Sequence, residues 1–190
     1  TVPDLLKQRH RHFSTALSVS YKRPINFRKA AFQYMYDGEG NTFLDAYNNI
    51  PLVGHSHPKV VEAGVQQMHR LNTNTRYLYE VLTGYAERLL STFPPQLDRV
   101  FFVNSGSAAT DLALRMARLF SANRKIAVLE HGYHGNTQVG IEISHYKFAG
   151  KGGAGAGEDI VTLTLPDTYR GAYRLNDGTA GRQFANEAAQ

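Results

Sequence analysis

Phe102-Val-Asn-Ser-Gly-Ser-Ala-Ala-Thr-Asp-Leu-Ala-Leu-Arg-Met-Ala-Arg118 is the stretch that decides the fold. It joins an apolar run of strand type at residues 99–103, through turn residues at 104–107, to a strong helical pattern at 109–120. The next apolar run, at residues 125–129, is typical of a second buried strand. Because a helix long enough for a right-handed crossover separates the two runs, we expect them to pair in parallel. The sequence therefore predicts an α/β sheet.

Upstream of this stretch, a β-hairpin is expected around Asp37-Gly-Glu-Gly-Asn41. Its two glycines can adopt the positive φ of a tight turn, and the flanking residues 32–36 and 42–47 are rich in aromatic side chains that favour strands. The other expected elements are a helix at residues 4–13 with Asp4 as its N-cap, helices at 58–71 and 78–90, a glycine loop at 150–157, a strand at 160–165 and a weakly helical tail from residue 176.

Composition and charge limit the classes of function that this chain can have. The chain has 190 residues, of which 42% are hydrophobic, so it can bury a core. It has no cysteine, which excludes disulfides, thiolate metal sites and thiol nucleophiles. No apolar run is long enough for a membrane helix and the first residues do not resemble a signal peptide, so we expect a cytoplasmic protein with no membrane association. Residues 1–30 carry a net charge of +6, which suits nucleic acid, an acidic substrate, an acidic partner or plain solvated surface.

The turn Ser105-Gly106-Ser107 lies between the first predicted strand and its helix. A helix N-terminus offers unpaired N–H donors and a partial positive charge, so this position can bind an anion such as a phosphate. Gly106 allows the backbone to approach a ligand, and the two serine hydroxyls can donate to phosphate or simply cap the helix. Taken alone, the motif fits a capped helix without a ligand equally well.

A second motif, His131-Gly-Tyr-His-Gly135, follows the second predicted strand. Ligands of open α/β sheets bind at the carboxyl ends of the strands, where this loop is expected. Tyr133 could lie flat on a planar ring whose phosphate is held at Gly106, or it could be an ordinary packed tyrosine. The pair of motifs favours a flat phosphorylated cofactor, either pyridoxal phosphate or a nucleotide.

These two motifs together resemble the paired cofactor motifs of class III aminotransferases. The hairpin and the turn Gly54-His-Ser-His-Pro58 also match the start of that family, and the match covers most of residues 30–150. The resemblance implies an α/β protein of pyridoxal-phosphate fold type I. Residues 1–70 would form an N-terminal arm and hairpin segment that is part of the small domain, and residues 71–190 the first part of the large, mainly parallel-sheet domain. The cofactor pyridoxal 5'-phosphate would contact Ser105, Gly106, Ser107, Tyr133 and His134.

Three further segments are similar to a narrower subgroup, the ethanolamine-phosphate and phosphohydroxylysine phospho-lyases: Leu71-Asn-Thr-Asn-Thr-Arg-Tyr77, Ile141-Glu-Ile-Ser-His-Tyr-Lys-Phe148 and Pro166-Asp-Thr-Tyr-Arg-Gly-Ala-Tyr-Arg174. This likeness implies elimination of phosphate from a small phosphorylated amine such as ethanolamine phosphate, by a homodimer with shared active sites. An ω-aminotransferase is the alternative. The implied substrate residues are Tyr21, Asn49, Thr75 and Arg76.

The sequence departs from the family pattern at two places. Ala108 stands where the family usually has glutamate, directly after the serine-glycine-serine turn. The family's Schiff-base lysine and the aspartate that pairs with the pyridine nitrogen lie beyond the matched part, and neither Lys147 nor Lys151 is expected to replace that lysine. Without it the chain alone cannot hold the cofactor covalently or shuttle a proton, so we expect a truncated part of an enzyme.

The residues also bear on three other interpretations: a non-catalytic protein, a nucleic-acid-binding module and a metal site. A non-catalytic scaffold or pseudoenzyme fits the departures just described. A nucleic-acid module would need aromatic residues interleaved with the basic arm, where only Phe13, Tyr21 and Phe27 occur, so no nucleic-acid partner is expected. His10-Arg-His12 and His55-Ser-His57 have no partner at a convincing spacing, so no metal is expected. Asp111, one turn into the helix, is interpreted as a favourable charge near the positive helix end.

Overall fold

The computed structural model describes residues 1–48, 52–175 and 178–190, and the chain divides into two compact units, Thr1–Glu80 and Val81–Gln190. This division falls between residues 80 and 81, whereas the sequence analysis placed a boundary between 70 and 71.

The first unit begins with helix α1, Val2–His12, and the predicted N-cap of this helix was wrong. Thr1 is the N-cap, because its hydroxyl accepts a hydrogen bond from the Asp4 backbone N–H at 3.4 Å. Asp4 occupies the third helical position, where its carboxylate completes a capping box with Thr1. The helix therefore starts earlier than predicted, since a proline is tolerated in its first turn.

Three antiparallel strands follow, in the order β1-β2-β3: β1 Phe27–Ala31, β2 Tyr34–Asp37 and β3 Thr42–Leu44. The predicted hairpin is confirmed, with Tyr36 opposite Thr42. The Asp37 carboxylate accepts from the N–H groups of Glu39 and Asn41, each at 2.9 Å, which fixes the turn. Strand β1 was not predicted, because its two consecutive basic residues hide the alternation that marks a strand.

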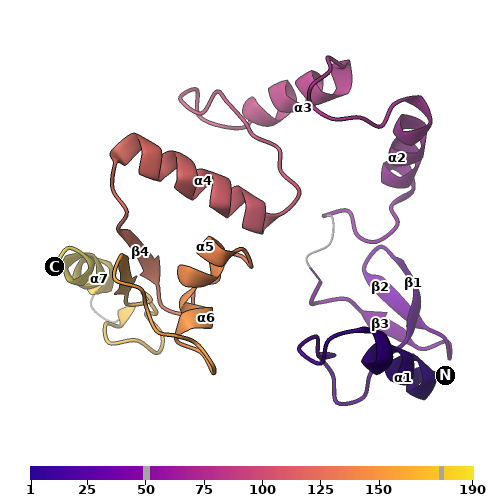
Figure 1. Cartoon of the computed structure of the whole chain (residues 1–190), viewed down its shortest axis with the longest axis horizontal. Helices are drawn as coiled ribbons and strands as arrows, with labels where there is room; N and C mark the ends of the chain where they lie inside the picture. The colour runs from indigo at the N-terminus through magenta and orange to yellow at the C-terminus, as the bar shows by residue number, and fades with distance from the viewer. Residues whose placement is uncertain (49–51, 176–177) are drawn as a thin grey trace. The chain divides into compact units, whose positions relative to one another are not determined.

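Two predicted helices are present as α2, Pro58–Arg70, and α3, Glu80–Leu90 (Figure 1). Pro58 lies in the first turn of α2, where its missing N–H leaves no intrahelical bond unmade. The apolar side chains of α2, among them Val61 and Met68, are exposed.

The second unit contains α4 Gly106–Ser121, β4 Ile126–Leu129, α5 Gln138–Glu142, α6 His145–Phe148, β5 Ile160–Leu163 and α7 Ala180–Ala188. Strands β4 and β5 are parallel, with Ile126 opposite Ile160 and Leu129 opposite Leu163. The short helices α5 and α6, which were not predicted, lie in the connection between them (Figure 1). A parallel α/β arrangement is thus present.

The strand predicted at residues 99–103 is absent, and with it the expected parallel pairing of this segment with β4. A strand is stabilised by hydrogen bonds to a neighbouring strand. Within the described parts of the chain, β4 pairs with β5 alone, so residues 99–103 have no ladder to join. Phe102 is held instead by a ring contact with Tyr85 of α3, with centroids 5.2 Å apart.

The core of the second unit lies between β4 and the two short helices. Val128, Ile143 and Phe148 are buried together, with partly buried apolar side chains from α4, β4 and β5 packed around them. Ser144 is fully buried, and its hydroxyl donates to the Gly140 carbonyl at 2.6 Å. In the part of the chain that the structure describes, no helix is both long enough and apolar enough to span a bilayer.

Candidate functional site

Ser105 forms the entry to α4. Its backbone is extended, with φ −164° and ψ 160°, and its hydroxyl accepts from the Ala108 N–H at 3.1 Å. Its carbonyl accepts from the Ala109 N–H at 3.0 Å. The N–H groups of Gly106 and Ser107 have no acceptor among the described residues. The cap therefore uses the Ser105 hydroxyl and leaves two backbone donors free for a ligand.

The space beside Gly106 is open. A β-carbon on Gly106 would meet no atom of the second unit within 4 Å, and the residue is exposed. Since α4 has 16 residues, its aligned peptide dipoles give this end a partial positive charge. An anion can thus reach the free N–H groups without displacing any side chain of this unit. We call residues 105–107 the anion cup.

The loop at residues 131–135, which we call the aromatic loop, contacts the anion cup directly. Gly135 has φ +127°, and a β-carbon there would lie 2.8 Å from the Ser107 Cα, closer than real contacts allow. The Asn136 N–H donates to the Ser107 hydroxyl oxygen at 3.0 Å. The structure therefore brings together the two motifs that the sequence analysis paired, and a glycine is required at their contact.

A second link joins α4 to the end of this loop. The Thr137 hydroxyl donates to Asp111 Oδ1 at 3.0 Å, and the same oxygen of Thr137 accepts from the Gly140 N–H at 3.0 Å as the cap of α5. Asp111 was interpreted only as a helix-end charge, but it also fixes the position of the loop. The pairing was missed because its partner lies 26 positions away in sequence, where no local pattern connects them.

Tyr133 projects from the aromatic loop and is 55% exposed. The ring of Tyr146 meets it edge to face, with centroids 6.3 Å apart and an interplanar angle of 87°. Tyr133 is two positions before Gly135, which touches the anion cup. An exposed aromatic side chain therefore belongs to the loop that contacts the anion cup, as expected of a site for a flat phosphorylated molecule.

His134 anchors the aromatic loop through its backbone. Its N–H donates to the hydroxyl oxygen of the buried Ser144 at 2.8 Å. Its Nε2 is buried and has no hydrogen-bond partner in the described structure, and a β-carbon on Gly132 would come within 2.9 Å of it. The predicted contact between His134 and the cofactor stays a prediction.

The predicted substrate residues belong to the first unit. Tyr21 is exposed in the segment between α1 and β1. Thr75 and Arg76 lie in an exposed turn between α2 and α3, where the Arg76 N–H donates to Asn74 Oδ1 at 3.0 Å. Asn49 lies outside the described residues. The anion cup and the aromatic loop belong to the second unit, so the substrate assignments also stay predictions.

Asp45 and His55 form a close polar pair that the sequence analysis did not identify. His55 Nε2 lies 2.6 Å from Asp45 Oδ2. The pKa of Asp45 is held well below its ordinary value, first by the Asn48 backbone N–H and then by the hydrogen bond with His55. Two backbone hydrogen bonds of 2.8 Å between Phe32 and His55 join the same segments. All these groups are paired with one another, so we interpret this cluster as a structural clamp.

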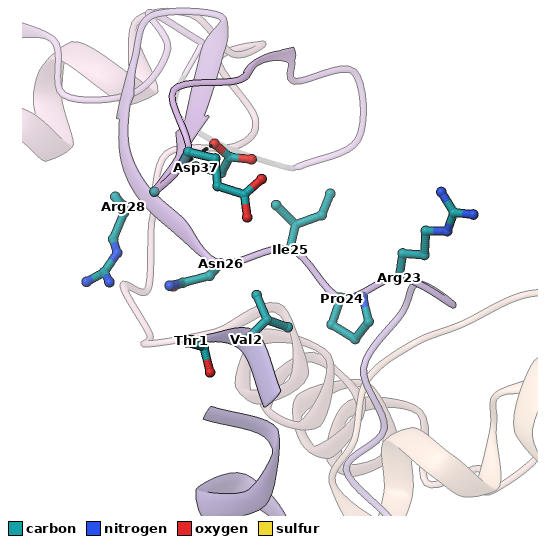
Figure 2. Close-up of a pocket in the computed structure, with 10 residues that line it drawn as sticks. Thr1, Val2, Arg23, Pro24, Ile25, Asn26, Arg28 and Asp37 are labelled. Atoms are coloured by element: carbon teal, nitrogen blue, oxygen red, sulfur yellow. Dashed lines mark hydrogen bonds between the residues drawn. The ribbon is translucent and has the colours of Figure 1, made fainter. Parts of the chain in front are cut away.

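The first unit also has an open hollow of about 290 Å³ between the start of α1, residues 23–26 and the hairpin turn (Figure 2). Arg23 and Arg28 lie on opposite sides of it in this view. Asp37, which also lines the hollow, is already engaged in the hydrogen bonds of the turn. None of the predicted site residues lines this hollow. Among the described residues, no group of three or more histidine, aspartate or glutamate side chains could hold a metal ion.

The chain is similar to known proteins over most of its length. The family model described as aminotransferase class-III matches residues 16–186. A Drosophila melanogaster protein named alanine–glyoxylate aminotransferase 2-like is 41% identical over 171 residues, which are 90% of this chain and 35% of that protein. The ethanolamine-phosphate phospho-lyase homolog 1 of Caenorhabditis elegans is 38% identical over 194 residues, covering 97% of this chain and 41% of the relative.

A solved structure of a phospholyase from Arthrobacter, in complex with phosphoethanolamine, superimposes with a TM-score of 0.85 at 33% sequence identity. The match covers 98% of this chain and 42% of the Arthrobacter chain. The chain thus spans less than half the length of these relatives. The match to the family model over residues 16–186 shows that the chain belongs to the class III aminotransferase family.

Proposed function

We propose that the complete enzyme containing this chain is a pyridoxal-phosphate-dependent phospho-lyase, which eliminates phosphate from an amino-alkyl phosphate such as ethanolamine phosphate. The observation that carries the proposal is the contact of Gly135 with Ser107, which joins the loop that bears the exposed Tyr133 to the helix start that bears two free N–H donors. The names of the Caenorhabditis and Arthrobacter relatives support the choice of substrate class.

The residues of the second unit fit the cofactor. The N–H groups of Gly106 and Ser107 would donate to the phosphate, and the open space at Gly106 admits it. Tyr133 would lie against the flat ring and exclude water from that face. Ser107 would hold the phosphate while its oxygen accepts from Asn136 N–H. When bound, pyridoxal phosphate supplies an electron sink for the carbon next to the substrate nitrogen.

The part of the chain described here would bind and orient the cofactor, and we propose that the lysine which holds it covalently and moves the proton lies in the remainder of the enzyme. The resemblance to class III aminotransferases supports a position for that lysine beyond the matched part. The chain spans 35% to 42% of the lengths of the three relatives reported above, which leaves room for it. An intact-mass measurement of the natural protein tests this proposal, because a mass of only 21.2 kDa would contradict it.

Release of inorganic phosphate tests the proposed reaction. The complete enzyme, loaded with pyridoxal phosphate, should convert ethanolamine phosphate and water to phosphate, ammonium and an aldehyde without any amino acceptor. The C–H bond next to the nitrogen and the C–O bond to phosphate both break, and a double bond forms between the two carbons. Phosphate leaves with the bonding electrons of the C–O bond. The unsaturated amine then regains a proton on carbon, and water hydrolyses it to the aldehyde and ammonium. Failure to release phosphate from any amino-alkyl phosphate would contradict the proposal.

An ω-aminotransferase is the second candidate, and the name of the Drosophila relative favours it. A transaminase would consume the amine only when a keto acid is present and would form a new amino acid in equal amount. Absence of both activities, with no cofactor absorbance in the purified complete protein, would favour a non-catalytic scaffold instead. Ala108, at the position where the family usually has glutamate, is the residue that suggests this last outcome.

We also propose that the complete enzyme is a homodimer. The resemblance to class III aminotransferases, whose family model matches residues 16–186, supports this proposal. Sedimentation equilibrium of the complete enzyme should give twice the mass of one chain, and a mass equal to one chain would contradict the proposal.

A further inference from the structure

We propose that Lys147 is the residue that recognises the phosphate of the amine substrate. The inference rests on the proposed function, and it names a substrate contact that lies beside the Tyr133 ring in the second unit.

The position of Lys147 is set by two aromatic rings. Its Nζ lies 5.7 Å from the centroid of Tyr133 and 5.5 Å from the centroid of Tyr146, and the two centroids are 6.3 Å apart. These three distances describe a nearly equilateral triangle, so the ammonium group occupies the angle between the rings. Tyr133 is still 55% exposed with Lys147 over its ring. A planar ligand could therefore stack on the part of the ring that Lys147 leaves open, with the ammonium close by.

The charge of Lys147 has no counter-ion in the described parts of the chain. The side chain is half-buried, and no carboxylate lies within ion-pair distance of it there. Partial removal of an ammonium from water is unfavourable, and cation–π contacts with two tyrosines compensate for it incompletely. An anionic group arriving beside the Tyr133 ring would supply the missing partner and form a charge-assisted hydrogen bond.

The backbone of Lys147 is held firmly, so its side chain is presented from a fixed point. The neighbouring Phe148 is part of the buried core, and the Lys147 N–H donates to the carbonyl of the fully buried Ser144 at 2.8 Å. The Tyr146 N–H donates to the Gly132 carbonyl at 3.1 Å, which ties α6 to the aromatic loop. Lys147 and Tyr133 therefore belong to one structural unit, and the lysine stays beside the ring.

The geometry assigns the substrate phosphate, and not the cofactor phosphate, to Lys147. The cofactor phosphate already has the free N–H groups of Gly106 and Ser107 at the start of α4. Ethanolamine phosphate, once joined to a cofactor ring stacked on Tyr133, would bring a second phosphate to the site. Only two carbons separate that phosphate from the amine nitrogen. That second phosphate needs a cation close to the ring, and the Lys147 ammonium lies 5.7 Å from the Tyr133 centroid.

The test compares two amines that differ only in the phosphate. The complete enzyme, loaded with pyridoxal phosphate, is titrated with ethanolamine phosphate and with ethanolamine while the cofactor absorbance is followed. We expect Lys147→Met to weaken binding of ethanolamine phosphate by roughly 10- to 150-fold, the loss expected for a hydrogen bond to a charged group, and to leave ethanolamine binding unchanged. Lys147→Arg should restore much of the difference. Lys151→Met, in the exposed glycine loop, is the matched control and should have no effect.

A second readout does not require any variant to fold. Ethanolamine phosphate should protect Lys147 of the wild-type enzyme from acetylation, and ethanolamine should not, as measured by mass spectrometry of its peptide. An equal loss of affinity for both amines in Lys147→Met, or unprotected Lys147 in the wild type, would overturn the inference while phosphate release by the wild type still supported the proposed function. A wild-type enzyme that neither releases phosphate nor prefers the phosphorylated amine would overturn both.

Discussion

Polar groups cluster at Asp45 in the first unit and at the start of α4 in the second, but they are used differently. Asp45 accepts hydrogen bonds from Tyr47, Asn48 and His55, and it is partly buried. At the start of α4, the N–H groups of Gly106 and Ser107 have no acceptor in the described structure, and the adjoining space is open. The first arrangement is complete without a ligand. The second has two free N–H donors from which an anion can accept hydrogen bonds.

This difference shows which polar groups indicate ligand binding. Satisfied polar groups stabilise the fold and gain nothing from a ligand, whereas pre-oriented, unsatisfied donors at a helix start gain a full set of hydrogen bonds when an anion binds. Changes at the contact of the anion cup and the aromatic loop should therefore alter cofactor affinity, and changes at the clamp of Asp45 should alter stability alone.

The largest effect is expected from Gly135→Ala. Its φ of +127° is strained for any side chain, and the added carbon would lie 2.8 Å from the Ser107 Cα, so the aromatic loop must move away from the anion cup. We expect the affinity of the complete enzyme for pyridoxal phosphate to fall by about 100-fold, the upper end of 1–3 kcal/mol of strain. Fluorescence or absorbance titration of the apoenzyme measures it.

Gly155→Ala is the matched control for this change. Gly155 also has a positive φ, of +83°, but a β-carbon there would meet nothing within 4 Å in its unit. It should lower thermal stability slightly and leave cofactor affinity unchanged. Equal losses of affinity in the two variants would show that general strain, and not the contact with Ser107, is responsible.

A smaller effect is expected at the link between Asp111 and Thr137. Removal of their 3.0 Å hydrogen bond by Asp111→Leu or Thr137→Val should loosen the aromatic loop and weaken cofactor binding by about 5-fold, the value of a typical hydrogen bond. Asp111→Asn retains an acceptor oxygen and should stay near wild type. In a double-mutant cycle, the Leu and Val changes should be non-additive, because both remove the same bond. Additive losses would contradict the proposed link.

Tyr133→Leu should reduce cofactor affinity by a few-fold, because an aliphatic side chain retains burial but loses the ring contact, worth about 0.5–1.5 kcal/mol. Tyr133→Phe, which keeps the ring, should bind the cofactor as the wild type does. Titration of both variants with pyridoxal phosphate separates the contribution of the ring to affinity from that of the hydroxyl. If Phe were as weak as Leu, the hydroxyl of Tyr133 and not its stacking face would carry the contact.

The accuracy of the sequence predictions differed between local and long-range features. The hairpin at Asp37-Gly-Glu-Gly-Asn41, α2 and α4 were predicted because turn glycines, a first-turn proline and helical spacing act over a few residues. The strand predicted at residues 99–103 was wrong, because an apolar run becomes a strand only beside a partner, and β4 pairs with β5. Local pattern also cannot reveal that β4 and β5 are neighbours.

The same distinction applies to the site. The anion cup was predicted from the order of turn and helix, and its association with the aromatic loop came from the position of both motifs at strand or helix ends together with the family resemblance. The pairs of Thr137 with Asp111 and of Lys147 with Tyr133 depend on side-chain positions that are set by tertiary packing. For the contact between the aromatic loop and the anion cup, Gly135 is the local sequence signal, because so close an approach of two backbones requires a residue without a side chain.

Changes at the clamp of the first unit are expected to have no effect on cofactor binding. The pH dependence of stability gives a further test of the clamp. The pKa of Asp45 is lowered in the folded protein, so its contribution to stability is complete above its unfolded value of about 3.9 and is lost as the pH falls toward the folded value. Asp45→Asn should therefore destabilise the first unit at neutral pH and flatten its acid unfolding curve below about pH 5. Hydrogen exchange of the Phe32 and His55 amides, which form the two 2.8 Å backbone bonds of the clamp, reports on this unit directly. Faster exchange of these amides in Asp45→Asn with unchanged cofactor affinity would show that the clamp stabilises the fold and does not take part in ligand binding. A loss of cofactor affinity in Asp45→Asn would show that the clamp also supports the ligand site.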